Sequence, residues 1–579
     1  MFKILLCFLA IPALLKAGYV ENFIFELTET RFVGFSQAIA NDMLFYALLW
    51  LLVYFSVLPN CWRWLSAFLR TLALLCWIIY CADYFVIKNF NTHLTFGDSI
   101  KYAGYAYKYL QQIYNLNNYT LSALCLLLLG ALLPLLLSPF RLPKQKFKTV
   151  PWVLFISAIL GYTVFADEHK YAHSWIYKNV VDYNLIILSE GSPYSAEFKQ
   201  ALHFDEAQTC QTLPSIPKNI IILMVESLSA YQSQFFSGIK DWTPNLDAIA
   251  QDNLAYRDFY ANGFITEDGE ISLLTGIPPI YPPSTYDNDG GTSFYSFFNL
   301  PDALPQALKK HHYHTEFLTS SDLEFGNTGQ WAQSIGFDYV EGHDHPDYNA
   351  WERFHFKSAP DAALYLRVLD RLKQQKQNFF LFIKTVSSHH PYVNPETKHA
   401  SEEEAIIYTD KQLGIFYQQL RNTGFFEHGI LLIVGDHHAM TPLKPHEAER
   451  FGQYQAAAKV PLVVIDGHSH GQEAQQFQQI DVFNTVLGEI SGTPCYSDWR
   501  GILWGTAKHS PKFIVHRRGD NRDKVSVFSQ DAAAQIKLDG DATRVVSDYP
   551  EDPSIRQLII DKINTLRITR SQWATATID

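Results

Sequence analysis

The segment NIIILMVES, residues 219–227, is a short apolar run that ends in a carboxylate and a hydroxyl. Continuous apolar runs of this length are typical of strands that are buried on both faces of a sheet. Further runs lie at 379–386 (FFLFIKTV), 430–434 (ILLIV) and 460–465 (VPLVVI), and helical patterns occur at 243–253, 360–373 and 402–422. Residues 506–579 read as closing strands and a final helix. Residues 218–579 are therefore predicted to form an α/β domain with a mainly parallel sheet flanked by helices.

Polar side chains follow three of these predicted strands. The first strand is followed by Glu226 and Ser227, the second by His389 and His390 within SSHHP, and the third by Asp436, His437 and His438. Since ligands of such sheets bind beyond the carboxyl ends of the strands, we expect these side chains to lie at one edge. Each alone is most simply a helix cap or a hydrogen-bonded polar residue. Together, Glu226, Asp436 and His437 have the oxygen and nitrogen atoms that a divalent cation prefers.

A candidate nucleophile lies in the segment FYANGFITEDGE, residues 259–270. Thr266 heads a polar turn that runs into a predicted helix start. Backbone N–H groups would be available to its hydroxyl, and coordination to a metal would lower the pKa of that hydroxyl. By itself the local pattern reads most simply as a helix N-cap, with a following Glu closing a capping box.

Residues 1–166 are much more apolar and predict an α-helical membrane domain. A bilayer core of about 30 Å requires about 20 apolar residues in helical form. Spans are predicted at about 2–17, 36–58, 64–87, 119–138 and 150–166, the first of which could instead be a signal peptide. Residues 167–217 are predicted to be a linker with amphipathic helices.

The distribution of charge sets the expected orientation. The loop 141–148 holds four Lys or Arg and no acidic residue, which predicts a cytoplasmic position and places residues after 166 on the opposite, extracytoplasmic side of the membrane. Residues 1–170 carry 13 Lys/Arg against 8 Asp/Glu, although the whole chain has a formal net charge of −12. The acidic remainder gives no electrostatic support for nucleic-acid binding.

Seven cysteines exclude a disulfide-dense scaffold in a chain of 579 residues. Five of them lie in or beside the predicted spans, and only Cys210 and Cys495 lie in the part predicted to be exported. In an oxidising compartment these two could form a disulfide, or they could remain unrelated free thiols. The sequence leaves both alternatives open.

Taken together, the motifs resemble the lipoteichoic acid synthase and phosphoglycerol transferase family of the alkaline phosphatase and sulfatase superfamily. The similar segments follow the family order between residue 217 and about residue 505. They are NIIILMVES (219–227), TPNLDAIAQDNLAYRDFYANG (243–263), ITEDGEISLLTGIPP (265–279), SIGFDY (334–339), SHHPY (388–392), VGDHH (434–438), VPLVVI (460–465) and QIDVFNTVLGEISG (479–492). This resemblance implies an alkaline-phosphatase-like fold for the exported domain.

The resemblance also implies a metal-dependent phosphotransferase. Four residues would bind one divalent metal ion, with Mn²⁺ in first place and Zn²⁺ or Mg²⁺ as alternatives: Glu226, Thr266, Asp436 and His437. Thr266 would be the nucleophile, and His389 would lie near the oxygens of the leaving group and the acceptor. Trp351 and Arg353 look like the family's Trp and Arg that hold glycerol phosphate. Ser227 and His390 would contact the same group.

The implied reaction moves glycerol phosphate from phosphatidylglycerol to a hydroxyl of an extracytoplasmic glycan or polymer. No Cys/Ser-x-Pro-x-Arg segment occurs, which argues against sulfate-ester hydrolysis. Phosphoethanolamine transfer to lipid A or a glycan is the main alternative, but Thr266 is followed by Glu-Asp-Gly-Glu rather than by Ser-Val-Pro-Cys. A phosphodiesterase that uses water remains a further alternative. A non-enzymatic membrane sensor would require a missing ligand or nucleophile, and none is missing.

Overall fold

The computed structural model divides the chain into two compact units. The N-terminal unit comprises Met1–Ser189 with Thr441–Pro445, and the C-terminal unit comprises Glu190–Met440 with His446–Asp579. The structure describes residues 62–90, 93–96, 206–215, 218–280, 294, 297–375, 378–441, 443–518, 524–530, 532–539 and 542–576, with isolated positions at 14–16, 18, 42, 45, 49, 51–56, 156, 179–181, 183–184, 195–196 and 198. The domain boundaries at 166 and 217 stay a prediction.

The main described element of the N-terminal unit is helix α3 (Arg63–Phe90). Within the described residues it is the one helix that is long and apolar enough to cross a membrane, over Arg63–Ile87 with a mean hydropathy of 1.8. It coincides with the predicted span 64–87. The predicted spans 2–17, 36–58, 119–138 and 150–166 lie largely or wholly outside the described residues and stay predictions.

A polar cluster joins described residues from three of the predicted spans. Lys16 Nζ lies 2.5 Å from Asp42 Oδ1, and the hydroxyl of Tyr80 on α3 donates to the other oxygen of Asp42. All three residues are buried. The pairing of Lys16 with Asp42 agrees with the rule that ionisable side chains within apolar helices pair with one another.

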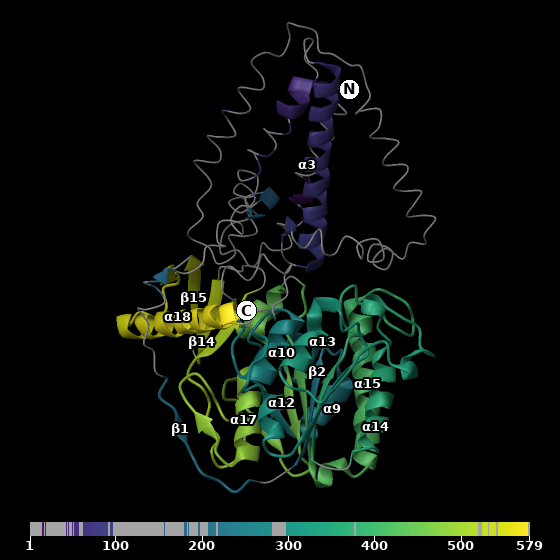
Figure 1. The fold of residues 1–579 in the computed structure, drawn as a ribbon, viewed down its shortest axis with the longest axis vertical. Helices are drawn as coiled ribbons and strands as arrows, with labels where there is room; N and C mark the ends of the chain where they lie inside the picture. Colours follow the sequence, from purple (N-terminus) through teal and green to yellow (C-terminus); the bar gives the residue numbers. More distant parts are fainter. Residues whose placement is uncertain are drawn as a thin grey trace. The chain divides into compact units, whose positions relative to one another are not determined.

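The C-terminal unit is built on an eight-stranded sheet (Figure 1). The strand order is β10 (Gly471–Glu473), β3 (Leu254–Tyr256), β9 (Leu462–Ile465), β8 (Gly429–Gly435), β2 (Asn219–Val225), β7 (Phe379–Lys384), β5 (His314–Thr319) and β6 (Tyr339–Glu341). Strands β8, β2, β7, β5 and β6 run parallel, whereas β9 is antiparallel to both neighbours. The expected mainly parallel sheet is confirmed, and the carboxyl ends of β8, β2 and β7 are adjacent.

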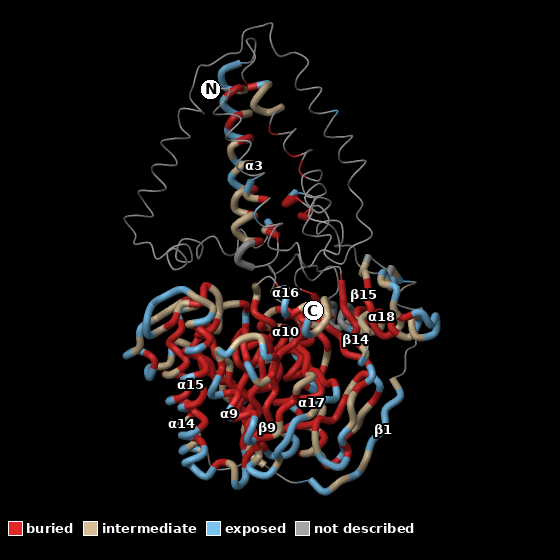
Figure 2. The backbone as a smooth tube through the Cα atoms, turned by 180° about the vertical axis from the view of Figure 1, so that it is seen from behind, coloured by how far each residue is buried: buried red, intermediate tan, exposed pale blue. Residues whose placement is uncertain are grey.

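Both faces of this sheet are buried, which explains why its central strand is apolar throughout. Alternate residues of β2 enter two different cores, because successive side chains of a strand point to opposite faces. One core includes helices α10 (Thr266–Thr275), α12 (Leu304–Lys309), α13 (Thr328–Ser334) and α17 (Gln479–Ser491). The other includes α9 (Pro244–Asp252), α14 (Asp361–Leu372) and α15 (Glu402–Asn422). The helices flank the sheet in Figure 1, and Figure 2 shows the buried residues running through the centre.

A small antiparallel sheet and a long helix complete the C-terminal unit. The sheet contains β13 (Ile514–Arg517), β14 (Lys524–Ser529), β15 (Ala532–Asp539) and β16 (Ala542–Val545), paired in that order. Helix α18 (Pro553–Ala576) packs on it through Ile559 and Ile563. The closing strands and final helix predicted for this region are confirmed.

Cys210 and Cys495 form a disulfide, which decides between the two alternatives that the sequence left open. The bond joins β1 (Thr209–Cys210) to β12 (Cys495–Tyr496), which pair antiparallel. The two cysteines are 285 residues apart in the chain. The disulfide therefore fastens the segment that precedes β2 to the region that follows α17.

Removal of this disulfide should destabilise the C-terminal unit. A cross-link across so long a loop restricts the unfolded chain, so the double variant Cys210→Ser/Cys495→Ser is expected to lose about 2–4 kcal/mol of unfolding free energy. Denaturant unfolding of the detergent-solubilised full chain, followed by tryptophan fluorescence, measures this loss. Cys76→Ser, which removes a free cysteine of α3, is the control. A double variant as stable as the wild type would contradict the prediction.

Candidate metal centre and active site

Three buried side chains from two neighbouring strand ends converge on one point. Glu226 follows β2, and Asp436 and His437 follow β8. Their candidate ligand atoms all lie within 4.8 Å of one another. His437 Nε2 is 3.6 Å from Glu226 Oε1 and 3.3 Å from Asp436 Oδ2. The parallel sheet thus brings together the three residues that the sequence placed at its edge.

Thr266 completes this group as the first residue of α10. Its side chain is buried, and Oγ1 donates a hydrogen bond to Glu226 Oε2 at 3.1 Å while lying 3.4 Å from His437 Nε2. The N-cap of α10 is Ile265. The N-cap interpretation of Thr266 is therefore wrong, because its hydroxyl contacts Glu226 and His437 instead of the helix backbone.

Helix α10 reaches the end of β8 through a glycine. A Cβ atom at Gly269 would lie only 2.7 Å from the carbonyl oxygen of Asp436. A side chain at this position would force the helix away from the strand end. Gly269 therefore permits the close approach that places Thr266 beside the carboxylates.

Hydrogen bonds within the strand ends orient Asp436 and His437. Asp436 Oδ1 accepts the backbone N–H groups of Ser227 and His437, each at 2.7 Å. His437 Nδ1 donates to the carbonyl of His438 at 2.7 Å. Because Nδ1 carries the hydrogen, Nε2 keeps its lone pair for the site when the ring is neutral, as in metal-binding histidines generally.

Glu226 is held mainly by the chain that follows β7. Its backbone N–H donates to Thr385 Oγ1 at 3.0 Å, and its carbonyl accepts from Ser388 Oγ at 2.5 Å. The hydroxyl of Ser227 donates to Glu226 Oε1 at 2.9 Å. Ser227 has a left-handed backbone with φ of 55°, an uncommon conformation for a non-glycine residue that is frequent at functional sites.

Asp436 Oδ2 shows that this group fits a divalent cation. The atom is buried and has no hydrogen-bond partner among the described residues, although Oδ1 accepts two. Burial and the neighbouring charge of Glu226 raise the pKa of Asp436 well above its ordinary value. One imidazole cannot offset the charges of two buried carboxylates, and a cation bound by oxygen and nitrogen would do so.

The pKa shifts of Glu226 and His437 indicate that a proton on His437 takes the place of the cation when the site is metal-free. Burial acts to raise the pKa of Glu226, but the charges of His389 and His437 outweigh it and hold that pKa well below the ordinary value. Burial acts to lower the pKa of His437, yet Asp436 and Glu226 raise it to about 10. At neutral pH the metal-free site therefore contains a protonated His437.

His389 lies in the loop that follows β7, near the candidate ligands. Its Nδ1 donates to the carbonyl of His390 at 2.5 Å, which leaves Nε2 available for proton transfer. The neighbouring Ser388 donates to the carbonyl of Glu226, which holds this loop beside the candidate ligands. The ring of His390 lies 5.2 Å from that of Tyr392, and burial together with His389 lowers the pKa of His390 to about 3.

Trp351 and Arg353 lie in the loop between β6 and α14. The guanidinium of Arg353 donates to the carbonyls of His343 at 2.9 Å and Lys357 at 3.2 Å. Trp351 is half-buried against a small cluster that includes Tyr348. The contacts of these two side chains are thus with their own loop and α14, whereas Glu226, Ser227, Thr266, Asp436 and His437 contact one another directly.

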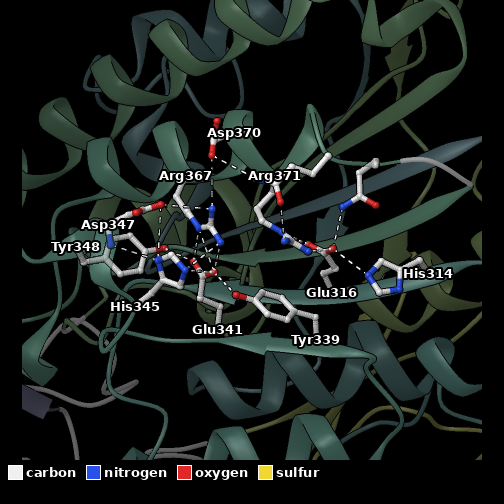
Figure 3. A network of polar contacts seen from close by, with 12 residues as sticks. His314, Glu316, Tyr339, Glu341, His345, Asp347, Tyr348, Arg367, Asp370 and Arg371 are labelled. Carbon is white, nitrogen blue, oxygen red and sulfur yellow. Dashed lines mark hydrogen bonds and ion pairs between the residues drawn. The ribbon is translucent and has the colours of Figure 1, made fainter.

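A buried polar network fastens the start of this loop (Figure 3). Glu341, the last residue of β6, accepts hydrogen bonds from Arg367 Nη2 of α14 at 2.7 Å and from the Tyr348 hydroxyl at 3.2 Å. Arg367 also contacts His345 Nε2 at 3.1 Å and lies 3.4 Å from Asp347. Helix α14 therefore fixes the position from which the Trp351 loop departs.

Sequence reasoning missed several residues that support the site. Gln479 Nε2 donates to the carbonyls of Gly435 and Asp436, at 2.9 and 2.7 Å. Lys384 Nζ lies 2.9 Å from Glu270, one turn after Thr266 on α10. A charged residue inside the otherwise apolar segment FFLFIKTV was an available signal for Lys384. Gln479 has no such signal, because its role depends on which loops meet in the fold.

Residues 218–491 match the family model described as Sulfatase. Among solved structures, a protein in the alkaline phosphatase superfamily from Vibrio parahaemolyticus superposes with a TM-score of 0.51 and 20% identity, covering 68% of this chain and 96% of that one. This likeness confirms the alkaline-phosphatase-like fold.

The chain is also similar to two curated enzymes, a lipoteichoic acid synthase and a phosphoglycerol transferase. Lipoteichoic acid synthase 1 of Bacillus subtilis is 25% identical over 335 residues, which cover 52% of this chain and 50% of that protein. Phosphoglycerol transferase I of Escherichia fergusonii is 24% identical over 263 residues, covering 42% of this chain and 33% of that protein. The chain thus spans half of the first relative and a third of the second.

Removing a candidate ligand should lower the metal content. In Asp436→Asn, the remaining oxygen can still accept from Ser227 and His437, but the unpaired anionic oxygen is replaced. We expect bound metal to fall from about one ion per chain to a small fraction of that, measured by elemental analysis after dialysis against Mn²⁺. Asp252→Asn, an exposed carboxylate of α9, is the control. Undiminished metal in Asp436→Asn would remove Asp436 from the ligand set.

Metal binding should release protons. Because His437 has a pKa of about 10 in the metal-free site, its ring is protonated at neutral pH, and a cation requires the deprotonated ring nitrogen. The apparent affinity is therefore expected to rise with pH, with release of about one proton per ion near pH 7. Calorimetry with Mn²⁺ in two buffers of different ionisation enthalpy measures this number. A binding enthalpy independent of buffer would contradict it.

Proposed function

We propose that the chain is a membrane-anchored phosphoglycerol transferase that moves glycerol phosphate from phosphatidylglycerol to a hydroxyl of an extracytoplasmic glycan or polymer. The observation that carries the proposal is the contact of the buried Thr266 hydroxyl with Glu226 and His437. The names of the relatives support glycerol phosphate as the transferred group. The disulfide supports an oxidising, extracytoplasmic environment for the C-terminal unit.

The reaction consists of two displacements at phosphorus. In the first, Thr266 Oγ1 loses its proton and bonds to phosphorus, the bond to the diacylglycerol oxygen breaks, and that oxygen takes up a proton. In the second, the acceptor hydroxyl loses its proton and bonds to the same phosphorus, the bond to Thr266 breaks, and Thr266 Oγ1 takes up a proton again. Two inversions give overall retention of configuration at phosphorus.

The residues of the chain have separate roles in these steps. Glu226 accepts the hydrogen bond of the Thr266 hydroxyl and orients its oxygen. The backbone N–H groups at the start of α10 favour negative charge beside Thr266. His389 Nε2 would give a proton to the diacylglycerol oxygen and later take one from the acceptor. A divalent ion, with Mn²⁺ in first place, would lower the pKa of the threonine hydroxyl and offset charge on the phosphoryl oxygens.

Five residues are proposed to contact the glycerol phosphate group: Ser227, Trp351, Arg353, His389 and His390. Arg353 would have to exchange one of its carbonyl contacts for a phosphate oxygen. Such an exchange is favourable because a hydrogen bond to an anion is stronger than one to a neutral carbonyl. The predicted membrane spans would keep the domain close to a donor that does not leave the bilayer.

Thr266→Ala should abolish diacylglycerol release, because no covalent intermediate can form. The full chain is incubated in proteoliposomes with labelled phosphatidylglycerol or labelled phosphatidylethanolamine, and trapped protein is analysed by mass spectrometry. We expect diacylglycerol from phosphatidylglycerol and a glycerophosphate adduct on Thr266. Thr266→Ser retains a hydroxyl and serves as the matched control, with partial activity.

Three results would overturn parts of the proposal. Wild-type rates in Thr266→Ala would exclude Thr266 as the nucleophile. An adduct with the mass of phosphoethanolamine would show that the transferred group is phosphoethanolamine and not glycerol phosphate. Release of free glycerol phosphate in the presence of glycan acceptors, without labelled glycan, would make the enzyme a phosphodiesterase.

A further inference from the structure

His355 is a buried residue with one ring nitrogen that lacks a partner. Only 6% of the residue is exposed, and Nε2 lies 3.1 Å from the carbonyl oxygen of Val386. Because a carbonyl only accepts, Nε2 carries the hydrogen and Nδ1 keeps a lone pair. Nδ1 has no hydrogen-bond partner in the part of the chain that the structure describes. A buried polar atom that stays unpaired is unfavourable, so its presence requires an explanation.

The imidazole of His355 lies against the proposed proton-transfer residue. The ring centroids of His355 and His389 are 5.4 Å apart, and the charge of Glu226 also acts on His355. Burial and the neighbouring His389 lower the pKa of His355 to about 4. The ring is therefore neutral at physiological pH, and Nδ1 can accept a hydrogen bond but cannot donate one.

The turn that carries His355 has a strained backbone. Phe356 and Lys357 have φ values of 52° and 54°, which are unfavourable for residues with side chains. The turn is held by Asp322, whose N–H donates to the Phe356 carbonyl at 2.9 Å and whose Oδ2 lies 2.7 Å from Lys357 Nζ. Strain that surrounding contacts maintain is typical of ligand-binding segments.

Phe356 is the half-buried ring that borders both imidazoles. Its centroid lies 4.7 Å from that of His389 and 5.4 Å from that of His355. Phe356 therefore packs against both rings and keeps the turn of His355 beside His389.

We propose that His355 selects the donor lipid by its headgroup, with Nδ1 accepting a hydrogen bond from a headgroup hydroxyl while the phosphate lies beside His389. This inference rests on the proposed function and deepens it by assigning recognition of a polyol headgroup to a residue outside the family motifs. A headgroup without a hydrogen-bond donor would leave Nδ1 unpaired.

Two substitutions of His355 test the roles of the two ring nitrogens separately. In His355→Gln, the side-chain amide can donate to the Val386 carbonyl in place of Nε2, but the Nδ1 acceptor is lost. In His355→Asn, an oxygen lies near the place of Nδ1, whereas the contact with Val386 is lost. The full chain with Mn²⁺ is assayed in mixed micelles for diacylglycerol release from phosphatidylglycerol and from phosphatidylpropanol, whose headgroup has the same carbon chain without hydroxyls.

The ratio of kcat/KM for the two lipids is the measurement that a purely structural role would not change. We expect the wild type to prefer phosphatidylglycerol by about tenfold or more, since a site built to bind a hydroxyl rejects an analogue that lacks it. In His355→Gln the ratio should fall towards one through loss of activity on phosphatidylglycerol. His355→Asn should keep most of the preference even where both rates fall.

The outcomes that overturn the inference are distinct from those that overturn the proposed function. A wild-type ratio near one, or an unchanged ratio in His355→Gln, overturns the role of His355 but leaves phosphoglycerol transfer intact. A wild-type enzyme that releases diacylglycerol from neither lipid overturns the proposed function, and the inference with it. A wild-type ratio near one overturns the inference without any variant, so this outcome does not depend on the folding of either variant.

Discussion

Two carboxylates, Glu226 and Asp436, are buried side by side, and the rest of the site is arranged around this unfavourable pair. Burial and mutual repulsion disfavour two negative charges in such a position. Backbone N–H groups donate to Asp436 Oδ1, and the hydroxyls of Ser227 and Thr266 donate to Glu226. Only Asp436 Oδ2 has no donor among the described residues. A fold that maintains this arrangement is suited to a divalent cation that completes it.

The register of the central sheet determines where these carboxylates lie. Strands β2 and β8 pair in parallel with Val225 opposite Gly435, so the next residues of the two strands are Glu226 and Asp436. The N–H of Asp436 donates to the carbonyl of Val225 at 3.2 Å, which extends the pairing to the site itself. A slip of one residue would turn every side chain of the strand to the opposite face. The apolar pattern that buries both faces of β2 thus also fixes the geometry of the ligands.

The site residues that could be predicted from the sequence are those whose positions follow from the apolar pattern and the strand register. Glu226, Asp436 and His437 were predictable because each directly follows an apolar run, and the ends of parallel strands meet at one edge. The position of Thr266 was predicted, but its local sequence indicated an N-cap, because the close approach of α10 at Gly269 is a tertiary feature. Cys210 and Cys495 were undecided, since their pairing depends on two segments 285 residues apart. His355 was missed for the same reason, because only the folded loop brings its ring to His389.

Helix α14 connects the two regions that the headgroup would contact. Its first residue, Asp361, accepts the backbone N–H groups of Val386 and Ser387, at 3.0 and 3.1 Å, and so fixes the chain that leads to His389. Two turns further on, Arg367 binds Glu341 at the start of the Trp351 loop. A buried ion pair adds little net stability compared with apolar packing, because both charges lose their hydration. The role of the Arg367–Glu341 pair is therefore to fix positions. Through it and Asp361, helix α14 holds His389 and the loop of His355 at a fixed separation. The proposed metal site depends on the sheet and the proposed headgroup selection on α14, so we expect changes in the loop to alter the choice of donor lipid without disturbing Thr266.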